Sequence, residues 1–104
     1  MGRVANKVAL ITGGASGLGL ASARRLAEEG ADVVINYHSD PRGAEAALAE
    51  IETLGRRGAI IRADLEMVDD VRDLVAQSAE ALGGLDVLVN NAGGRVSGEA
   101  FTAA

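Results

Sequence analysis

Residues 12–19 read Thr-Gly-Gly-Ala-Ser-Gly-Leu-Gly and follow directly on a short apolar run, residues 7–12. A helical stretch, Leu18–Glu29, begins inside the same motif. A phosphate group approaches backbone N–H groups closely only where no Cβ intervenes, and a helix N-terminus adds unpaired donors and a partial positive charge. The motif therefore predicts a diphosphate-binding turn between a strand and a helix.

Each glycine of this motif has its own expected use. Gly13 can make the tight turn, Gly17 can let the backbone approach the diphosphate, and Gly19 can let the helix pack closely against the strands. A Walker phosphate loop is one alternative, but it requires a lysine where Leu20 stands, so we discount ATP or GTP chemistry. The other alternative is a glycine-rich turn that binds no ligand.

Four β-rich runs recur at similar spacing along the chain. Three are nearly continuous apolar runs, typical of strands buried on both faces of a parallel sheet, and the third along the chain is more polar and suits a sheet edge. The four predicted strands are Lys7–Thr12, Asp32–Tyr37, Gly58–Ala63 and Leu85–Asn90.

Three helical stretches separate these strands: Leu18–Glu29, Gly43–Leu54 and Val68–Leu82. Each is followed by a glycine suited to a left-handed helix end, and Pro41 stands just before the second. In the third stretch, helical periodicity predicts a core-facing stripe. The three glycines are Gly30, Gly55 and Gly83, and the stripe is Val68, Val71, Val75, Ala79 and Leu82.

Alternating strands and helices predict an α/β fold with a parallel sheet and right-handed crossovers. For a nucleotide-binding half the expected strand order is 3-2-1-4, with the first two helices on one face and the third on the other. We expect residues 1–93 to form this unit and residues 94–104 to be a loose tail. Leu85–Asn90 is then an unpaired edge strand, through which we expect a homo-oligomer to form.

Composition excludes several classes of function. Ten Lys and Arg against fifteen Asp and Glu give a net charge of −5, which argues against binding to nucleic acid or to a membrane surface. The absence of cysteine excludes disulfides and thiolate ligands, and with one histidine, His38, we predict no metal site. No apolar run is long enough for a transmembrane helix or a secretory signal, so we expect a soluble, cytoplasmic protein.

The spacing Gly-x-x-x-Gly-x-Gly, Asp64 at the end of the third predicted strand, and Asn90-Asn91-Ala92-Gly93 after the fourth together resemble the short-chain dehydrogenase/reductase family. The resemblance covers roughly the first 95 residues and is strongest to the 3-oxoacyl-carrier-protein reductase and glucose dehydrogenase subgroup. It implies a Rossmann-like fold, an oxidoreductase and an NAD(P) site. It places the diphosphate on Gly13, Gly17 and Gly19, the adenine along Asp64 and Leu65, and the adenosine and its ribose beside Asn90, Ala92 and Gly93. Ser16 and Leu18, within the same loop, are also expected to bind the cofactor.

Without the resemblance, two of these features have plainer explanations. Asp64 could be a turn aspartate, and residues 90–93 could be ordinary strand-end turn residues, because Asn and Gly both tolerate left-handed backbone angles.

Cofactor preference is expected to depend on the residues after the second strand, where NAD-selective sites carry an acid that binds the ribose 2′-hydroxyl. Tyr37 stands at that position, and Asp40 comes too late. His38, Ser39 and Arg42 offer donors for a 2′-phosphate instead, so we predict NADP as the preferred cofactor, with NAD possible.

The family's chemistry uses a serine and a tyrosine–lysine pair four residues apart, the tyrosine acting as acid or base. Here the one tyrosine, Tyr37, has Pro41 four residues later, and the one lysine is Lys7. We therefore assign no catalytic residue and expect this chain alone to be inactive. Three interpretations follow: the cofactor-binding portion of a reductase, a stand-alone dinucleotide-binding module, or a structural or assembly protein without turnover.

Overall fold

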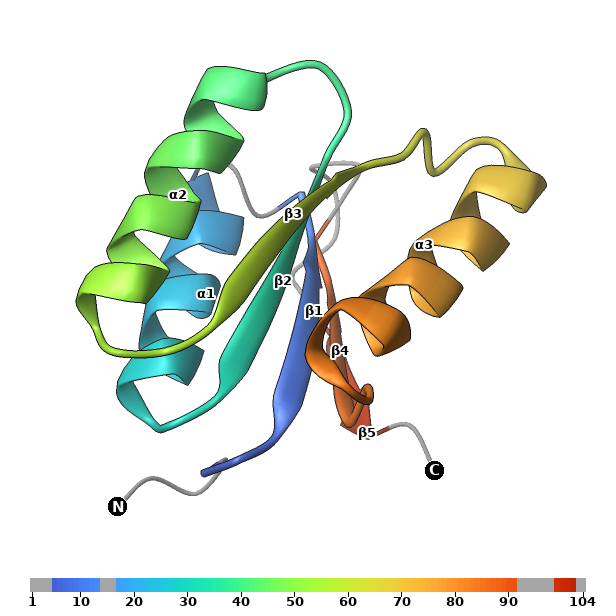
Figure 1. Ribbon diagram of the computed structural model, residues 1–104. Helices are drawn as coiled ribbons and strands as arrows, with labels where there is room; N and C mark the ends of the chain where they lie inside the picture. The colour runs from blue at the N-terminus through green and yellow to red at the C-terminus, as the bar shows by residue number, and fades with distance from the viewer. Residues whose placement is uncertain (1–4, 14–16, 92–98, 103–104) are drawn as a thin grey trace.

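The structure, a computed structural model, describes residues 5–13, 17–91 and 99–102. Four parallel strands and one antiparallel strand form a single sheet in the order β3-β2-β1-β4-β5 (Figure 1). The strands are β1 (Val8–Thr12), β2 (Asp32–Tyr37), β3 (Gly58–Arg62), β4 (Val87–Asn90) and β5 (Glu99–Thr102), and the helices are α1 (Gly17–Glu28), α2 (Pro41–Thr53) and α3 (Val68–Leu82). The predicted α/β fold and its 3-2-1-4 strand order are confirmed.

The burial of each strand follows its composition. All of β1 and all but the last residue of β2 are buried, as their continuous apolar runs predicted. The more polar β3 lies at one edge of the sheet, is half-buried along most of its length, and ends on the exposed Arg62. The central strands therefore form the rigid part of the sheet, and their carboxyl ends provide fixed positions for polar side chains.

The helices cover both faces of the sheet, α1 and α2 on one and α3 on the other, as predicted (Figure 1). Small side chains on α1 and α2 let these helices lie close to β1 and β2, whereas α3 packs with larger ones. The first core contains Ala23, Ala27, Ala47 and Ile51 against Ala9, Ile11, Val33 and Ile35, and the second contains Leu74 and Leu82 against Val8, Leu10 and Val34. Among the described residues, no helix combines the length and apolar character needed to cross a bilayer.

The α2 helix begins two residues earlier than its periodicity indicated. Asp40 is its N-cap, and the Asp40 carboxylate accepts a hydrogen bond of 2.9 Å from the Gly43 N–H. Pro41 occupies the first turn, where its missing N–H costs nothing. The glycines predicted to end the helices all have positive φ, +99° at Gly30, +81° at Gly55 and +83° at Gly83.

The buried face of α3 differs from the predicted stripe. Leu74, Ser78 and Leu82 are buried, whereas Val68, Val71 and Val75 are 68%, 38% and 41% exposed. Apolar residues extend around a wider arc of this helix than the sheet can cover. Periodicity predicted that arc, but which stripe within it is buried depends on how the helix is rotated against β2 and β3, on which it packs. The prediction was therefore wrong for the valines and right for Leu82.

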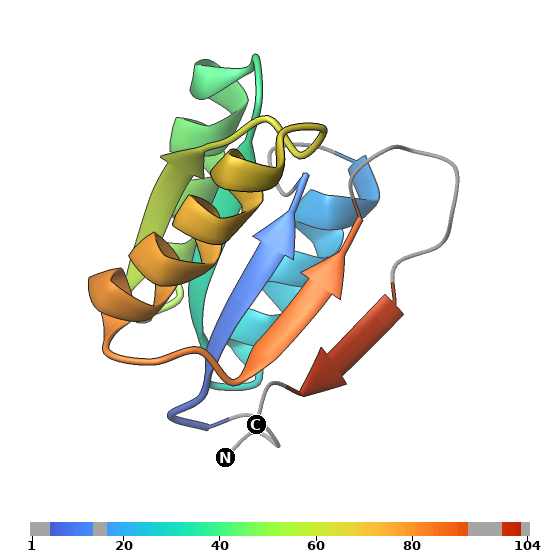
Figure 2. The same ribbon diagram turned by 90° about the vertical axis from the view of Figure 1, so that its right-hand side faces the viewer.

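The prediction that β4 is an unpaired edge was wrong. Residues 99–102, assigned to a loose tail, form β5, which runs antiparallel to β4 with Leu88 opposite Phe101 (Figure 2). The N–H and C=O groups that would have paired with a second chain pair instead with this chain's own residues. Four residues are too few to show strand periodicity, so the sequence carried no clear signal for β5.

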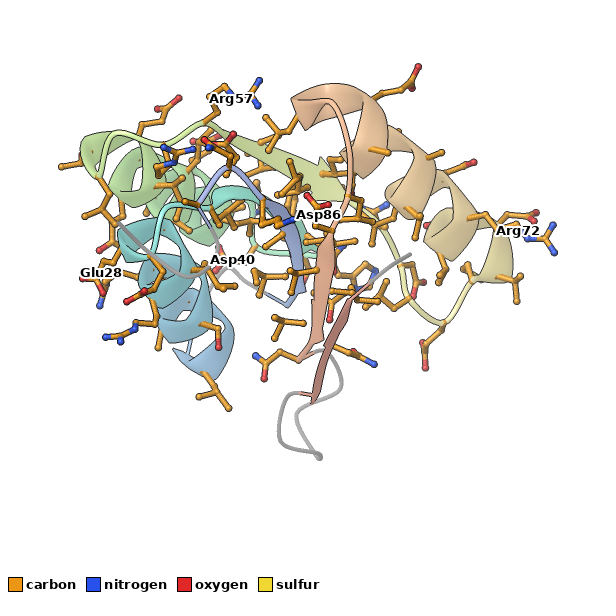
Figure 3. All side chains as sticks on the ribbon, turned by 90° about the horizontal axis from the view of Figure 1, so that it is seen from below. Glu28, Asp40, Arg57, Arg72 and Asp86 are labelled. Carbon is orange, nitrogen blue, oxygen red and sulfur yellow. The ribbon has the colours of Figure 1, made fainter. Side chains whose placement is uncertain are left out.

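At the amino ends of the strands, the carboxylates serve structural contacts. The Asp86 carboxylate accepts a hydrogen bond of 2.9 Å from the Val8 N–H, which ties β4 to the start of β1 (Figure 3). Asp32, at the start of β2, accepts hydrogen bonds from Arg57 on the turn before β3. These two carboxylates therefore hold the amino ends of neighbouring strands together.

Candidate functional site

A cavity of about 720 Å³ opens at the carboxyl ends of β1, β2 and β4. Its volume falls within the range of small-molecule and cofactor sites. Its lining combines polar side chains from the carboxyl ends of the four parallel strands with apolar side chains of β1, β4 and α3. The polar group is Thr12, Asn36, His38, Asp64, Glu66, Asn90 and Asn91, and the apolar group includes Leu10, Leu74, Val75 and Leu88.

The glycine loop, the name we give to residues 12–19, begins at one wall of this cavity. Gly13 has φ of +63°, so it makes the tight turn that only glycine adopts readily. Gly17, the first residue of α1, has φ of +60°, and a Cβ built on it would have no atom of the described residues within 4 Å. The part of the chain that the structure describes therefore leaves open the space above the first turn of α1, whose N–H groups have no partner within the helix.

Gly19 lies close to Gly13 and to Asn91. A Cβ at this position would overlap the Gly13 carbonyl oxygen and lie 2.8 Å from the Asn91 side-chain nitrogen. The nearest atoms thus belong to Gly13, directly after β1, and to Asn91, directly after β4. Only glycine lets α1 begin this near the loop that precedes it.

Thr12 holds β1 and β4 together at the cavity. Its hydroxyl oxygen accepts a hydrogen bond of 2.8 Å from the Asn91 N–H. The same oxygen lies 3.0 Å from the Asn90 side-chain oxygen and 3.3 Å from the Val89 carbonyl oxygen, to which it can donate its proton. This network fixes Asn90 and Asn91 at the end of β4, beside the glycine loop.

Asn36 is a site residue that the sequence reasoning did not select. It is buried on β2, and its side-chain oxygen lies 3.3 Å from the Gly13 nitrogen, which donates to it. One signal was available: a single amide interrupts the apolar run Val33–Ile35 just where that strand ends. Its partners from other strands are Gly13, directly after β1, and Ile61 and Ala63, at the end of β3, so they became visible only with the sheet order.

The side chains of His38 and Asp64 lie next to each other in the lining of the cavity. The His38 Nε2 and an Asp64 carboxylate oxygen are 3.8 Å apart, and the histidine side chain is 58% exposed. The other Asp64 oxygen accepts a hydrogen bond of 3.0 Å from the Glu66 N–H, which fixes the carboxylate at the end of β3. A cation on His38 would therefore stand next to a held anion.

Five predicted site residues line the cavity: Gly13, His38, Asp64, Leu65 and Asn90. Gly17, Leu18 and Gly19 form the adjoining first turn of α1, where Leu18 is largely exposed. Ser39 is exposed and Arg42 lies on α2, and neither lines the cavity. Ser16, Ala92 and Gly93 lie outside the described residues.

Comparison with known proteins identifies the family. The short chain dehydrogenase family model matches residues 7–103. Glucose 1-dehydrogenase 2 of Bacillus subtilis is 40% identical over 87 residues, 84% of this chain and 34% of that protein. The 3-oxoacyl-[acyl-carrier-protein] reductase FabG of Staphylococcus epidermidis is 41% identical over 88 residues, 85% of this chain and 36% of that protein.

Solved structures agree with this result. A short chain dehydrogenase from Burkholderia cenocepacia, in complex with NADP, has a TM-score of 0.80 at 50% identity, with 83% of this chain and 35% of that chain covered. Carveol dehydrogenase from Mycobacterium avium, in complex with NAD, has a TM-score of 0.83 at 36% identity, with 89% and 38% covered.

The chain thus spans about a third of the length of the relatives it matches. The resemblance predicted from the glycine loop, Asp64 and residues 90–93 is confirmed, and the chain belongs to the short-chain dehydrogenase family.

Proposed function

We propose that this chain binds a nicotinamide dinucleotide, preferring NADP to NAD, as the cofactor-binding portion of a short-chain oxidoreductase. One observation carries the proposal: the glycine loop, Asp64 and Asn90 meet at one cavity where β1 lies between β2 and β4. There the strand order reverses, and ligands of open α/β sheets bind outside the carboxyl ends of strands at such a point.

The residues present fit the chemistry of a dinucleotide. Open space above Gly17 forms a cradle that a Cβ would fill, beside the unpaired N–H groups of the first turn of α1. We infer that this turn takes the diphosphate, while Asp64 and Leu65 adjoin the adenine and Asn90 the ribose. The bound nicotinamide supplies hydride transfer, and this chain's residues bind and orient it.

The preference for NADP rests on the end of β2. Tyr37 stands where an NAD-selective site would carry an acid, and the Asp40 carboxylate is occupied as the N-cap of α2. His38 lines the cavity and can donate to a 2′-phosphate, with Asp64 beside it. Relatives with NADP and with NAD are both known, so this local chemistry is the basis for the choice.

Calorimetric titration of the chain with NADP and NAD tests this proposal. We expect NADP to bind more tightly, and His38→Ala to weaken NADP binding by about tenfold, as loss of one charge-assisted hydrogen bond does. NAD binding should change little, which makes it the internal control. Equal affinity of the wild type for both cofactors would contradict the proposed NADP preference. Binding of neither cofactor would contradict the proposed site.

We also propose that the chain forms a homo-oligomer, through α3 rather than through β4. Met67 and Val68, at the start of α3, are 55% and 68% exposed and do not line the cavity, and adjacent exposed apolar side chains of this kind can contribute to an interaction surface. Sedimentation velocity over a concentration series should show association that Val68→Lys reduces. A monomer at every concentration would contradict this. The cysteine-free sequence is suited to a reducing compartment, so we propose a cytoplasmic location.

A further inference from the structure

The buried side-chain amide of Asn36 connects the residue after β1 with the end of β3. It is 2% exposed on β2, and its side-chain oxygen accepts a hydrogen bond from the Gly13 N–H. Its side-chain nitrogen lies 3.3 Å from the carbonyl oxygens of Tyr37 and Ala63 and 3.4 Å from that of Ile61. Two N–H hydrogens are thus shared among three acceptors, and every polar atom of the side chain is used.

The environment fixes the orientation of this amide. Turned the other way, its nitrogen would face the Gly13 N–H and its oxygen would face three carbonyl oxygens, which repel it. An aspartate could accept from Gly13 but could donate to no carbonyl. A leucine would leave buried backbone groups unpaired. A short amide is therefore the side chain that pairs both the Gly13 N–H and the carbonyl oxygens on the opposite side.

The backbone groups on the two sides of Asn36 adjoin different parts of the proposed ligand. Gly13 is the first residue of the glycine loop, and Ala63 directly precedes Asp64 and Leu65 on the adenine side. Because Asn36 bonds to both, it sets the distance between the diphosphate wall and the adenosine wall. The Gly13 N–H donates to Asn36, so we do not count it among the donors to the diphosphate.

We propose that Asn36 is a positioning residue that couples the two walls of the dinucleotide site, an inference that rests on the proposed function. Its side chain bonds to backbone groups of the protein, so it acts on the ligand through Gly13 and Ala63. A ligand that reaches both walls should therefore depend on Asn36 more strongly than a ligand that occupies one wall. That difference separates positioning from a general contribution to folding.

The test compares NADP with adenosine 2′-monophosphate, which carries the adenosine side and neither phosphate of the diphosphate bridge. For Asn36→Ala we expect NADP affinity to fall by at least about tenfold and the fragment's affinity by less than about threefold. Asn36→Asp, which keeps the acceptor and loses the donors, should show the same pattern. Val34→Ala is the matched control, because Val34 is equally buried on β2 and does not line the cavity.

A parallel fall for both ligands, or an equal fall in Val34→Ala, would overturn the inference. If the wild type binds NADP and Asn36→Ala binds it equally well, this inference fails and the proposed function stands. If the wild type binds no dinucleotide, the proposed function itself fails. Should the variants not fold, amide exchange of the wild type decides: protection of the Gly13 N–H supports the Asn36 contact, and exchange at the unprotected rate overturns it.

Discussion

Gly19→Ala is expected to lower NADP affinity about a hundredfold, equivalent to about one or two hydrogen bonds to a charged group, because it displaces backbone donors of the proposed diphosphate site. The added Cβ would overlap the Gly13 carbonyl oxygen and crowd the Asn91 side chain. The first contact is with backbone, which cannot turn aside as a flexible side chain can. Either the glycine loop or the start of α1 must move, and both belong to the proposed diphosphate site.

Stability gives this prediction a second readout with an unusual sign. At an ordinary helix position, Gly→Ala stabilises by about 1 kcal/mol. Here we expect the overlap to outweigh that gain and to lower the free energy of unfolding by about 1–3 kcal/mol, as overpacking does. Urea denaturation and NADP titration measure the two effects. Ala21→Val, on the exposed side of the same helix, is the control and should alter both only slightly. A Gly19→Ala chain that is more stable and binds normally would contradict the account.

Asp32→Asn is expected to produce the largest loss of stability away from the cavity, about 1.5–3 kcal/mol, the usual range for hydrogen bonds to a charged group. The Asp32 side chain is 7% exposed and accepts from the Arg57 backbone N–H at 3.0 Å and from the Arg57 guanidinium at 2.9 and 3.0 Å. Arg56 lies 3.0 Å from its other oxygen. Arg57 also donates to the Leu82 carbonyl oxygen, so the cluster joins β2, β3 and the end of α3.

The same cluster predicts a dependence of stability on pH. Burial alone would raise the pKa of Asp32, but hydrogen bonds from Arg57 and the charges of Arg56 and Arg57 outweigh it and hold the pKa below its ordinary value of 3.8. A lowered pKa in the folded state means that this stabilisation is present above the ordinary value and is lost as the pH falls through the lowered one.

Urea denaturation at neutral and at acidic pH measures this effect. The gap in stability between wild type and Asp32→Asn should be large at neutral pH and should narrow in acid. Glu50→Gln is the matched control, because the Glu50–Arg24 pair is exposed at both ends and such pairs contribute about 0–1 kcal/mol. A gap that is constant with pH would show that the carboxylate charge at Asp32 contributes nothing.

Much of this fold could be predicted from local patterns. The buried runs of β1 and β2, the glycines after the helices and the strand–loop–helix context of residues 12–19 each act within a few neighbouring residues. They therefore predicted the element order, the sheet order and the position of the glycine loop. The gathering of Gly13, Asp64 and Asn90 at one cavity followed from the parallel arrangement of the strands.

What could not be predicted depends on contacts between distant residues. Asn36 bonds to Ala63 only because β2 and β3 are paired in one register, and Asp32 meets Arg57 for the same reason. The rotation of α3, which buries Leu74 and exposes Val75, is decided by the sheet beneath it. The β5 strand exists through its pairing with β4, and four residues alone do not reveal it.

The central claim is that a dinucleotide binds at the carboxyl ends of β1, β2 and β4, and titration of the isotopically labelled chain with NADP tests it most directly. We predict saturable shifts of backbone amide resonances at Gly13, Gly17, Asp64 and Asn90, with little change around Arg57 at the opposite end of the sheet. Unchanged spectra at saturating NADP, or shifts confined to the Arg57 end, would contradict the account.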